Sequence, residues 1–185
     1  LSTHNPDIGI LAAENPEIEL LMFSMNPAFD MFGAMGDIMD YRAEDAFDDE
    51  ELSSLNPQRA ELYELCENNG TAITVMKGFA GGNLLSSETS PFGVALTPVQ
   101  CINYALEQKG VSSIFVGVKT VDELMESLKY CKATDAEKDY AEVLRNAPQH
   151  SFRGQCTYCG HCAPCTSEID IASVSIAFVT ISTCI

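Results

Sequence analysis

The sequence predicts an α/β protein in which short parallel strands alternate with helices. Three short runs of apolar and β-branched residues, at 19–24, 72–76 and 113–117, have the length and composition of buried strands. Helix start and stop signals lie between these runs, so that a step of helix, glycine stop and strand occurs twice. The absence of strict alternation along residues 19–24 is typical of a parallel sheet, whose strands are buried on both faces.

The first half of the chain contains two predicted helices. Asn5 as the cap and Pro6 at the first helical position predict a helix over residues 6–13. Asn56 and Pro57 begin the next helix, which Gly70 ends before the strand at 72–76. The glycine-rich turn over residues 77–82 follows this strand and contains one cation, so it is either an anion-binding turn or an ordinary glycine loop.

The second half repeats the pattern. Thr97 and Pro98 begin a helix that runs to Leu106, and Gly110 stops it before the strand at 113–117. An amphipathic helix over residues 121–128 follows, with its N-terminus expected at the same sheet edge as the glycine turn. Lys119 beside free helix N–H groups suits a phosphate, and Thr120 as a plain helix cap is the alternative. A last helix is expected over residues 136–145.

Charge and composition exclude several classes of function. The 185 residues include 27 acidic and 10 basic ones, for a net charge of −17, which repels nucleic acids and anionic membranes. No signal segment or tract of membrane-spanning length is apparent, so we expect a cytoplasmic protein that binds neither nucleic acid nor membrane. The chain opens on Leu1 rather than Met, which suggests a fragment. The acidic stretch at 37–51 is expected to be solvated.

Four cysteines at a constant spacing of three form the strongest chemical signal: Cys156, Cys159, Cys162 and Cys165. A loop that presents a thiolate at every third residue can wrap a 4Fe-4S cluster. Zinc and disulfides are the alternatives, although structural zinc sites usually combine two separated cysteine pairs. Cys165 is the expected fourth ligand and Cys184 the alternative. His161 is expected to shield such a cluster rather than ligate it, and the remaining cysteines, Cys66, Cys101 and Cys131, to be core residues.

Motifs in a fixed order carry a family resemblance: Ser2-Thr-His-Asn5-Pro6, Met22-Phe-Ser-Met-Asn26, Val75-Met-Lys77 with Gly81-Gly82, and Val116-Gly117-Val-Lys119-Thr120. Over about residues 1–171, the chain resembles the last part of an aldo/keto reductase, in the subgroup with a C-terminal ferredoxin-like 4Fe-4S module. The resemblance implies a partial (β/α)8 TIM barrel, about the last three to four βα units, over residues 1–148. A small ferredoxin-like iron-sulfur segment then occupies residues 149–185.

The resemblance also implies an NAD(P) site. Ser2 and Asn5 would contact the nicotinamide amide, and Met76 would replace the residue that stacks on the nicotinamide ring. Lys77, Gly81 and Gly82 would lie along the pyrophosphate. Gly117, Lys119 and Thr120 would face the adenosine phosphate, and Ser127 replaces an adenine-contacting asparagine.

The family's catalytic tyrosine, lysine, aspartate and histidine belong to the first half of the barrel and have no counterpart here. The expected function is therefore part of an NAD(P)-dependent oxidoreductase that transfers electrons through a 4Fe-4S cluster to or from a small carbonyl substrate or a redox partner protein. A non-catalytic electron-transfer module or a zinc-stabilised binding module derived from such an enzyme is the alternative.

Overall fold

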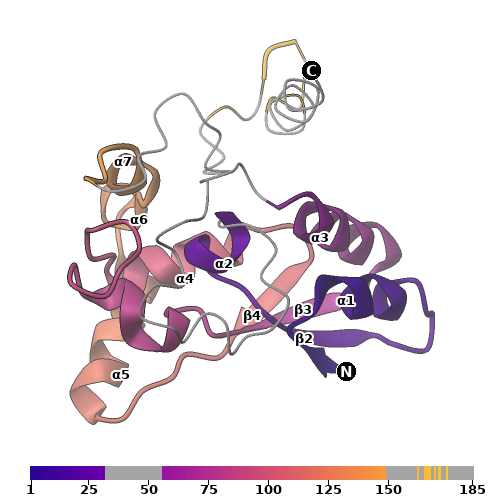
Figure 1. Ribbon diagram of the computed structural model, residues 1–185, viewed down its shortest axis with the longest axis horizontal. Coiled ribbons are helices and arrows are strands. Elements are labelled where there is room, and N and C mark those ends of the chain that lie inside the picture. Colours follow the sequence, from indigo (N-terminus) through magenta and orange to yellow (C-terminus); the bar gives the residue numbers. More distant parts are fainter. Residues whose placement is uncertain are drawn as a thin grey trace.

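The computed structural model describes residues 1–31 and 56–148, together with 162, 165–167, 169, 171 and 174. The described residues form an α/β unit around a four-stranded sheet (Figure 1). Its elements are β1 Ser2–Thr3, α1 Pro6–Ala13, β2 Leu20–Ser24, α2 Pro27–Met31, α3 Pro57–Asn69, β3 Ala72–Met76, η2 Ala80–Leu85, α4 Pro98–Leu106, β4 Val111–Ile114, α5 Val121–Leu128, η3 Lys129–Lys132, α6 Asp135–Lys138 and α7 Ala141–Arg145.

The sheet is parallel throughout, as predicted, and its strand order β1-β2-β3-β4 is the same as the chain order. Each crossover therefore advances by one strand in the same direction. This winding is compatible with part of a β/α barrel. The carboxyl ends of the strands meet at one edge, where Ser24 pairs with Met76.

The two faces of the sheet differ in character. Leu21, Phe23, Ile73 and Val75 are fully buried and belong to the hydrophobic core. The residues between them point to the opposite face, because side chains alternate along a strand. There the register aligns one residue from each strand, Ser2, Met22, Thr74 and Ser113, and the Thr74 and Ser113 hydroxyls are hydrogen-bonded at 2.9 Å.

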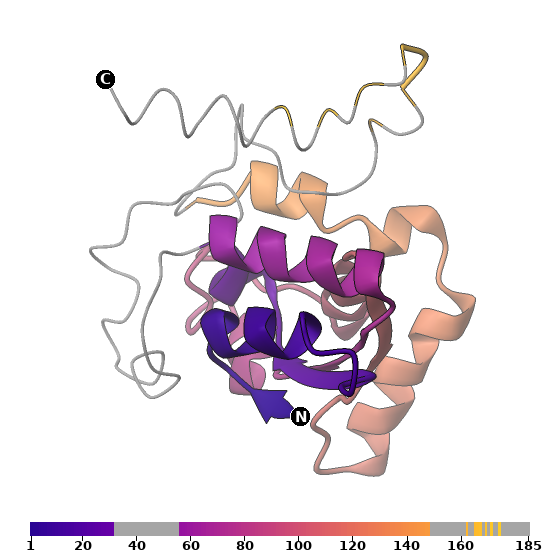
Figure 2. The ribbon, with the colours of Figure 1, turned by 90° about the vertical axis from the view of Figure 1, so that its right-hand side faces the viewer.

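Helices α1 and α3 lie side by side on the core face (Figure 2). A Cβ atom at Gly9 would come within 2.7 Å of Leu62 Cδ2, so the glycine permits this close packing. Both helices have the predicted caps: the Asn5 side chain accepts from the backbone N–H of Asp7, and Asn56 accepts from that of Gln58. Gly70 ends α3 with a φ of 74°, as predicted.

Two predictions of secondary structure are wrong. The expected helix over 136–145 is divided into α6 and α7, because Asp139 adopts an extended conformation and its carbonyl accepts from Gln100 Nε2 of α4 at 2.9 Å. The fourth strand begins and ends earlier than predicted, at Val111–Ile114. It begins earlier because Val111 already pairs with Ile73, and it ends earlier because β3 turns away at Lys77. Helix α2 was not predicted.

One cysteine prediction is also wrong. Cys66 and Cys101 are buried core residues, but Cys131 lies in η3 and is exposed. Burial raises the pKa of the Cys66 thiol to about 11 and that of Cys101 to about 12. The acidic stretch at 37–51 and His161 lie outside the described residues.

Candidate functional site

A cleft of about 710 Å³ opens at the carboxyl ends of β3 and β4. Two segments form its walls: the turn after β3 with η2, and the connection from β4 into α5. These segments lie far apart in the sequence, on either side of α4, and the parallel pairing of β3 with β4 brings their ends together. The residues lining the cleft include five predicted nucleotide contacts, Lys77, Gly81, Gly82, Gly117 and Lys119, and also Ser127.

The first wall has an unusual backbone. Lys77 and Ala80 adopt positive φ angles of 63° and 50°, and Gly81 and Gly82 continue the turn with φ angles of 72° and 103°. Such angles are unfavourable for side chains with a Cβ atom, and glycine adopts them freely. Because a Cβ atom at Gly81 or Gly82 would have no neighbour within 4 Å, the backbone of this turn faces open space that a ligand can fill.

The second wall is the start of α5. Thr120 caps this helix: its side-chain oxygen accepts from the backbone N–H of Glu123 at 3.2 Å. The Glu123 carboxylate reaches back and accepts from the backbone N–H of Lys119 at 2.5 Å. A phosphate near the start of α5 would therefore compete with Glu123 for the Lys119 N–H.

The charges at the cleft are mixed. Lys77 and Lys119 supply two cations, while Asp122, Glu123 and Glu126 supply three carboxylates. One of these is neutralised locally, since Lys129 Nζ lies 2.6 Å from Glu126 Oε2. The two lysines can attract a phosphorylated ligand, and the carboxylates oppose each additional phosphate.

Apolar side chains complete the cleft. Phe79 and Leu85 contribute from the first wall, and Phe115, Val116 and Val118 from the second. Phe115 is 63% exposed, and its ring is available to a planar group of a ligand. A cleft with apolar walls and a few charged groups is typical of small-molecule and cofactor sites.

Four of the predicted nucleotide contacts do not line this cleft in the described structure: Ser2, Asn5, Met76 and Thr120. Ser2 pairs with Met22 in the sheet, and the side-chain oxygen Oδ1 of Asn5 caps α1. Met76 pairs with Ser24, and its carbonyl accepts from the backbone N–H of Met25 at 3.1 Å. Thr120 caps α5, which was the alternative interpretation of this residue.

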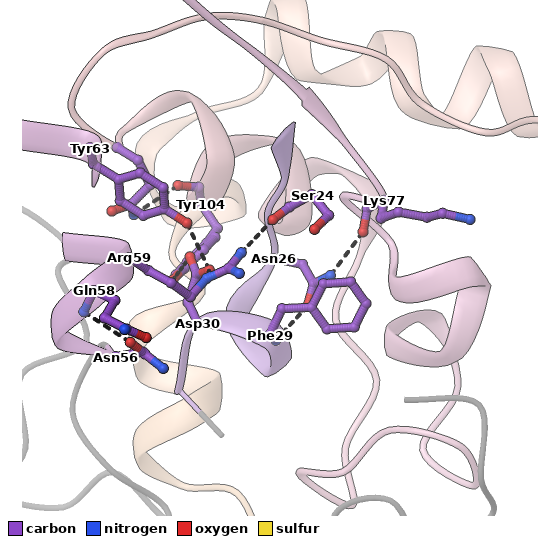
Figure 3. A network of polar contacts seen from close by, with 11 residues as sticks. Ser24, Asn26, Phe29, Asp30, Asn56, Gln58, Arg59, Tyr63, Lys77 and Tyr104 are labelled. Carbon is purple, nitrogen blue, oxygen red and sulfur yellow. Dashed lines mark hydrogen bonds and ion pairs between the residues drawn. The ribbon is translucent and has the colours of Figure 1, made fainter. Parts of the chain in front are cut away.

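A buried polar network supports the sheet beside the cleft (Figure 3). Asp30 Oδ1 accepts from Arg59 Nε at 2.6 Å and from the Tyr63 hydroxyl at 2.9 Å, and Oδ2 accepts from the Tyr104 hydroxyl at 2.7 Å. Arg59 also donates to the Ser24 carbonyl at the end of β2 and lies over the Phe23 ring. Burial, together with the nearby Asp30, raises the pKa of both tyrosines well above the ordinary value, so their hydroxyls stay protonated donors.

The cysteine run is only partly within the described residues. Cys156 and Cys159 lie outside them, Cys162 is exposed and Cys165 is half-buried. Hydrogen bonds from the backbone N–H groups of Ile169 and Ser167 lower the pKa of the Cys165 thiol. Such bonds favour the thiolate, which is the form that ligates metals. No group of three or more metal-ligating side chains occurs among the residues that the structure describes.

Several residues near the cleft were missed by reasoning from the sequence. The carboxylates of Asp122 and Glu123 fall in the first turn of a helix, where acidic residues are ordinary. Phe115 was expected to lie inside a strand. Asn26 was quoted only as part of a motif, although its side chain contacts the backbone of Lys77, 51 positions away.

A scan of protein-family models, a search of curated proteins and a search of solved structures each found no match to this chain. None of the helices in the described ranges combines the length and the apolar character needed to cross a bilayer.

Proposed function

We propose that this chain binds a nicotinamide dinucleotide in the cleft at the carboxyl ends of β3 and β4. It does so as part of an NAD(P)-dependent oxidoreductase that resembles the aldo/keto reductases. The observation that supports this proposal most directly is that one cleft is lined by Lys77, Gly81, Gly82, Gly117 and Lys119. These residues come from two segments that follow neighbouring strands, and the parallel pairing of β3 with β4 places both segments at one edge of the sheet.

The cleft has features that suit such a ligand. Open backbone at Gly81 and Gly82 permits close approach of a pyrophosphate, and Lys77 and Lys119 supply the opposing charge. In parallel α/β proteins, ligands bind at the carboxyl ends of the strands, which is where this cleft lies. The singly wound parallel sheet supports the further proposal that the strands are the last units of a β/α barrel.

The proposal includes a 4Fe-4S cluster on Cys156, Cys159, Cys162 and Cys165. The regular spacing and the thiolate-favouring hydrogen bonds at Cys165 support it. When bound, the cluster would supply one-electron transfer, and the nucleotide would exchange a hydride. The four cysteines would hold the cluster, and the residues that line the cleft would hold the nucleotide. The substrate of the parent reaction would be a small carbonyl compound or a redox partner protein.

Titration of the full chain with NADH and NADPH, followed by nucleotide fluorescence, tests the first half of the proposal. Saturable binding is expected, and Lys119→Gln should weaken it. Lys109→Gln is the matched control, because Lys109 does not line the cleft and pairs with Glu64 at 3.5 Å on an exposed part of the surface. Failure of both nucleotides to bind would overturn the proposal.

A second candidate is an electron-transfer or zinc-stabilised module with no turnover of its own. It is favoured because this sequence contains no counterpart of the catalytic tyrosine, lysine, aspartate and histidine of the aldo/keto reductases. Metal analysis after anaerobic reconstitution separates the two metals: iron with acid-labile sulfide supports the cluster, and stoichiometric zinc without iron supports the zinc-stabilised module.

A further inference from the structure

We infer that Asn26 is the positioning residue for the first wall of the nucleotide cleft, the turn that begins at Lys77. Its carboxamide holds the Lys77 backbone in the left-handed conformation from which the glycine turn begins. This inference rests on the proposed function, since it concerns the same cleft, and it assigns a role to a side chain that lies outside the cleft lining.

The contacts of Asn26 use both ends of its carboxamide. Nδ2 donates to the Lys77 carbonyl at 2.9 Å, and Oδ1 accepts from the backbone N–H of Phe29 at 3.0 Å (Figure 3). The backbone carbonyl of Asn26 accepts from the N–H of Asp30 at 3.1 Å. Asn26 is fully buried, so water does not compete for these bonds. The side chain is thus fixed by the start of α2 and directed at Lys77.

Lys77 is the point at which the chain leaves the sheet. Met25 N–H still donates to the Met76 carbonyl at 3.1 Å, so β2 and β3 remain paired up to that residue. At the next position, the hydrogen bond to β3 comes from the Asn26 side chain instead of the backbone, and it is donated to the Lys77 carbonyl. Lys77 then has a φ of 63°, a conformation that residues with a Cβ atom rarely adopt unless surrounding contacts hold them there.

The Lys77 carbonyl links this contact to the rest of the turn. The same oxygen that accepts from Asn26 also accepts from the backbone N–H of Ala80 at 2.8 Å. Gly81 and Gly82 follow directly and line the cleft. Because one carbonyl oxygen receives both donors, its orientation sets the direction of the turn and the place where the Lys77 side chain enters the cleft.

The test replaces the donor and keeps the helix cap. In Asn26→Ser, the hydroxyl is a good helix cap for Phe29 N–H but is too short to reach the Lys77 carbonyl. NADH affinity is expected to fall about two- to tenfold, the range that corresponds to one net hydrogen bond. Asn69→Ser is the matched control, because Asn69 Nδ2 donates to the Ala13 carbonyl at 3.0 Å at the opposite end of the sheet. The control should bind NADH as the wild type does.

A double-mutant cycle separates positioning from general destabilisation. In a Lys77→Gly background, which lacks the side chain that Asn26 is inferred to position, the Asn26→Ser change should lower NADH affinity by a smaller factor than it does in the wild type, and an equal factor in both backgrounds would contradict the inference. Should Asn26→Ser fail to fold, Asn26→Thr retains a hydroxyl acceptor for the Phe29 N–H and is likewise too short to donate to the Lys77 carbonyl. Equal NADH affinity of the folded Asn26 variants and the wild type would overturn the inference and leave the proposed function intact.

Hydrogen exchange at the Ala80 amide gives a readout that needs no nucleotide. Exchange at Ala80 should be faster in Asn26→Ser than in the wild type or in Asn69→Ser, because the carbonyl that Ala80 donates to is no longer fixed. Unchanged exchange would contradict the positioning role even if the nucleotide proposal holds. A wild type that binds neither NADH nor NADPH, with faster exchange in Asn26→Ser, would reject the nucleotide cleft and retain Asn26 only as the residue that fixes the turn.

Discussion

Arg59 Nε donates to Asp30 Oδ1 at 2.6 Å in the interior of the protein, where Asp30 is fully buried. This pair joins α3 to α2 across an interval of 29 residues, and the Tyr63 and Tyr104 hydroxyls donate two further hydrogen bonds to the carboxylate. Arg59 extends the connection to the Ser24 carbonyl at the end of β2. The network therefore fixes three helices, α2, α3 and α4, against the sheet edge that carries the cleft.

Asp30→Asn should destabilise the protein strongly. The amide keeps the shape of the carboxyl group but removes the charge opposite a buried guanidinium, and breaking a buried pair in this way costs about 3–5 kcal/mol. Urea denaturation measures the free energy of unfolding. Glu64→Gln, at the exposed pair with Lys109, is the control and should cost less than about 1 kcal/mol. An Asp30→Asn loss as small as that of the control would contradict the structural role of the network.

Gly81→Ala and Gly70→Ala form a matched pair. Their φ angles are 72° and 74°, and a Cβ atom at either has no neighbour within 4 Å. Each alanine should cost about 1–2 kcal/mol of stability, because both must hold a left-handed conformation. Only Gly81 lines the cleft, so only Gly81→Ala should also weaken NADH binding in a fluorescence titration. Equal effects of the two variants on affinity would argue against the cleft as the nucleotide site.

Asp122→Asn should tighten nucleotide binding. Asp122 is an exposed carboxylate that lines the cleft, and its removal takes away repulsion worth up to about 1 kcal/mol, or roughly fivefold in affinity. The gain should be larger for NADPH than for NADH, and should shrink at 1 M salt through screening. Asp135→Asn, in the first turn of α6, is the control and should change neither affinity. No gain for Asp122→Asn at low salt would contradict this account of the charges.

Cys165→Ser should reduce the iron and acid-labile sulfide recovered after anaerobic reconstitution. The serine cannot supply the thiolate that Cys165 is proposed to contribute. Cys131→Ser is the control, because Cys131 is exposed in η3 and is not part of the cysteine run. If the two variants bind the same amount of iron, Cys165 is not a ligand, and Cys184 becomes the residue to test.

Stability should fall as the pH rises above about 9. Burial raises the pKa of Cys101 from 9.0 to about 12, so the thiol ionises in the unfolded chain before it does so in the folded protein. The unfolded state then binds fewer protons, and each such group lowers the free energy of unfolding by up to about 1.4 kcal/mol per pH unit. Cys66 contributes in the same direction, since its pKa is raised to about 11.

Cys101→Ala isolates one of these groups. Its overall stability will be lower because a buried side chain is truncated, but the slope of stability between pH 9 and 10 should be shallower than in the wild type. Cys131→Ala is the control and should leave the slope unchanged, because Cys131 is exposed in η3. A wild-type slope in Cys101→Ala would exclude Cys101 as a contributor.

Local signals in the sequence determined most of the helices and strands. The helix at Pro6–Ala13, the strand at Ala72–Met76 and the helix at Val121–Leu128 have the predicted bounds. In each case the deciding information is a few residues long: a capping side chain, a proline at the first helical position or a compact β-branched run. The same local signals selected Lys77, Gly81 and Lys119 for the cleft, since a glycine turn and a helix start directly follow predicted strands. The nucleotide and cluster assignments remain predictions.

Contacts between distant residues were decided only by the tertiary structure. The sequence contains no sign that Gln100 would bind the Asp139 carbonyl and interrupt the last helix, or that Arg59 would find Asp30. It also contains no sign that Asn26 would hold the backbone of Lys77. These pairings depend on which strands become neighbours and in what register, and burial then makes each one obligatory because an unpaired polar group in the interior is costly. Local propensity chose the elements, and long-range pairing chose the geometry of the cleft between them.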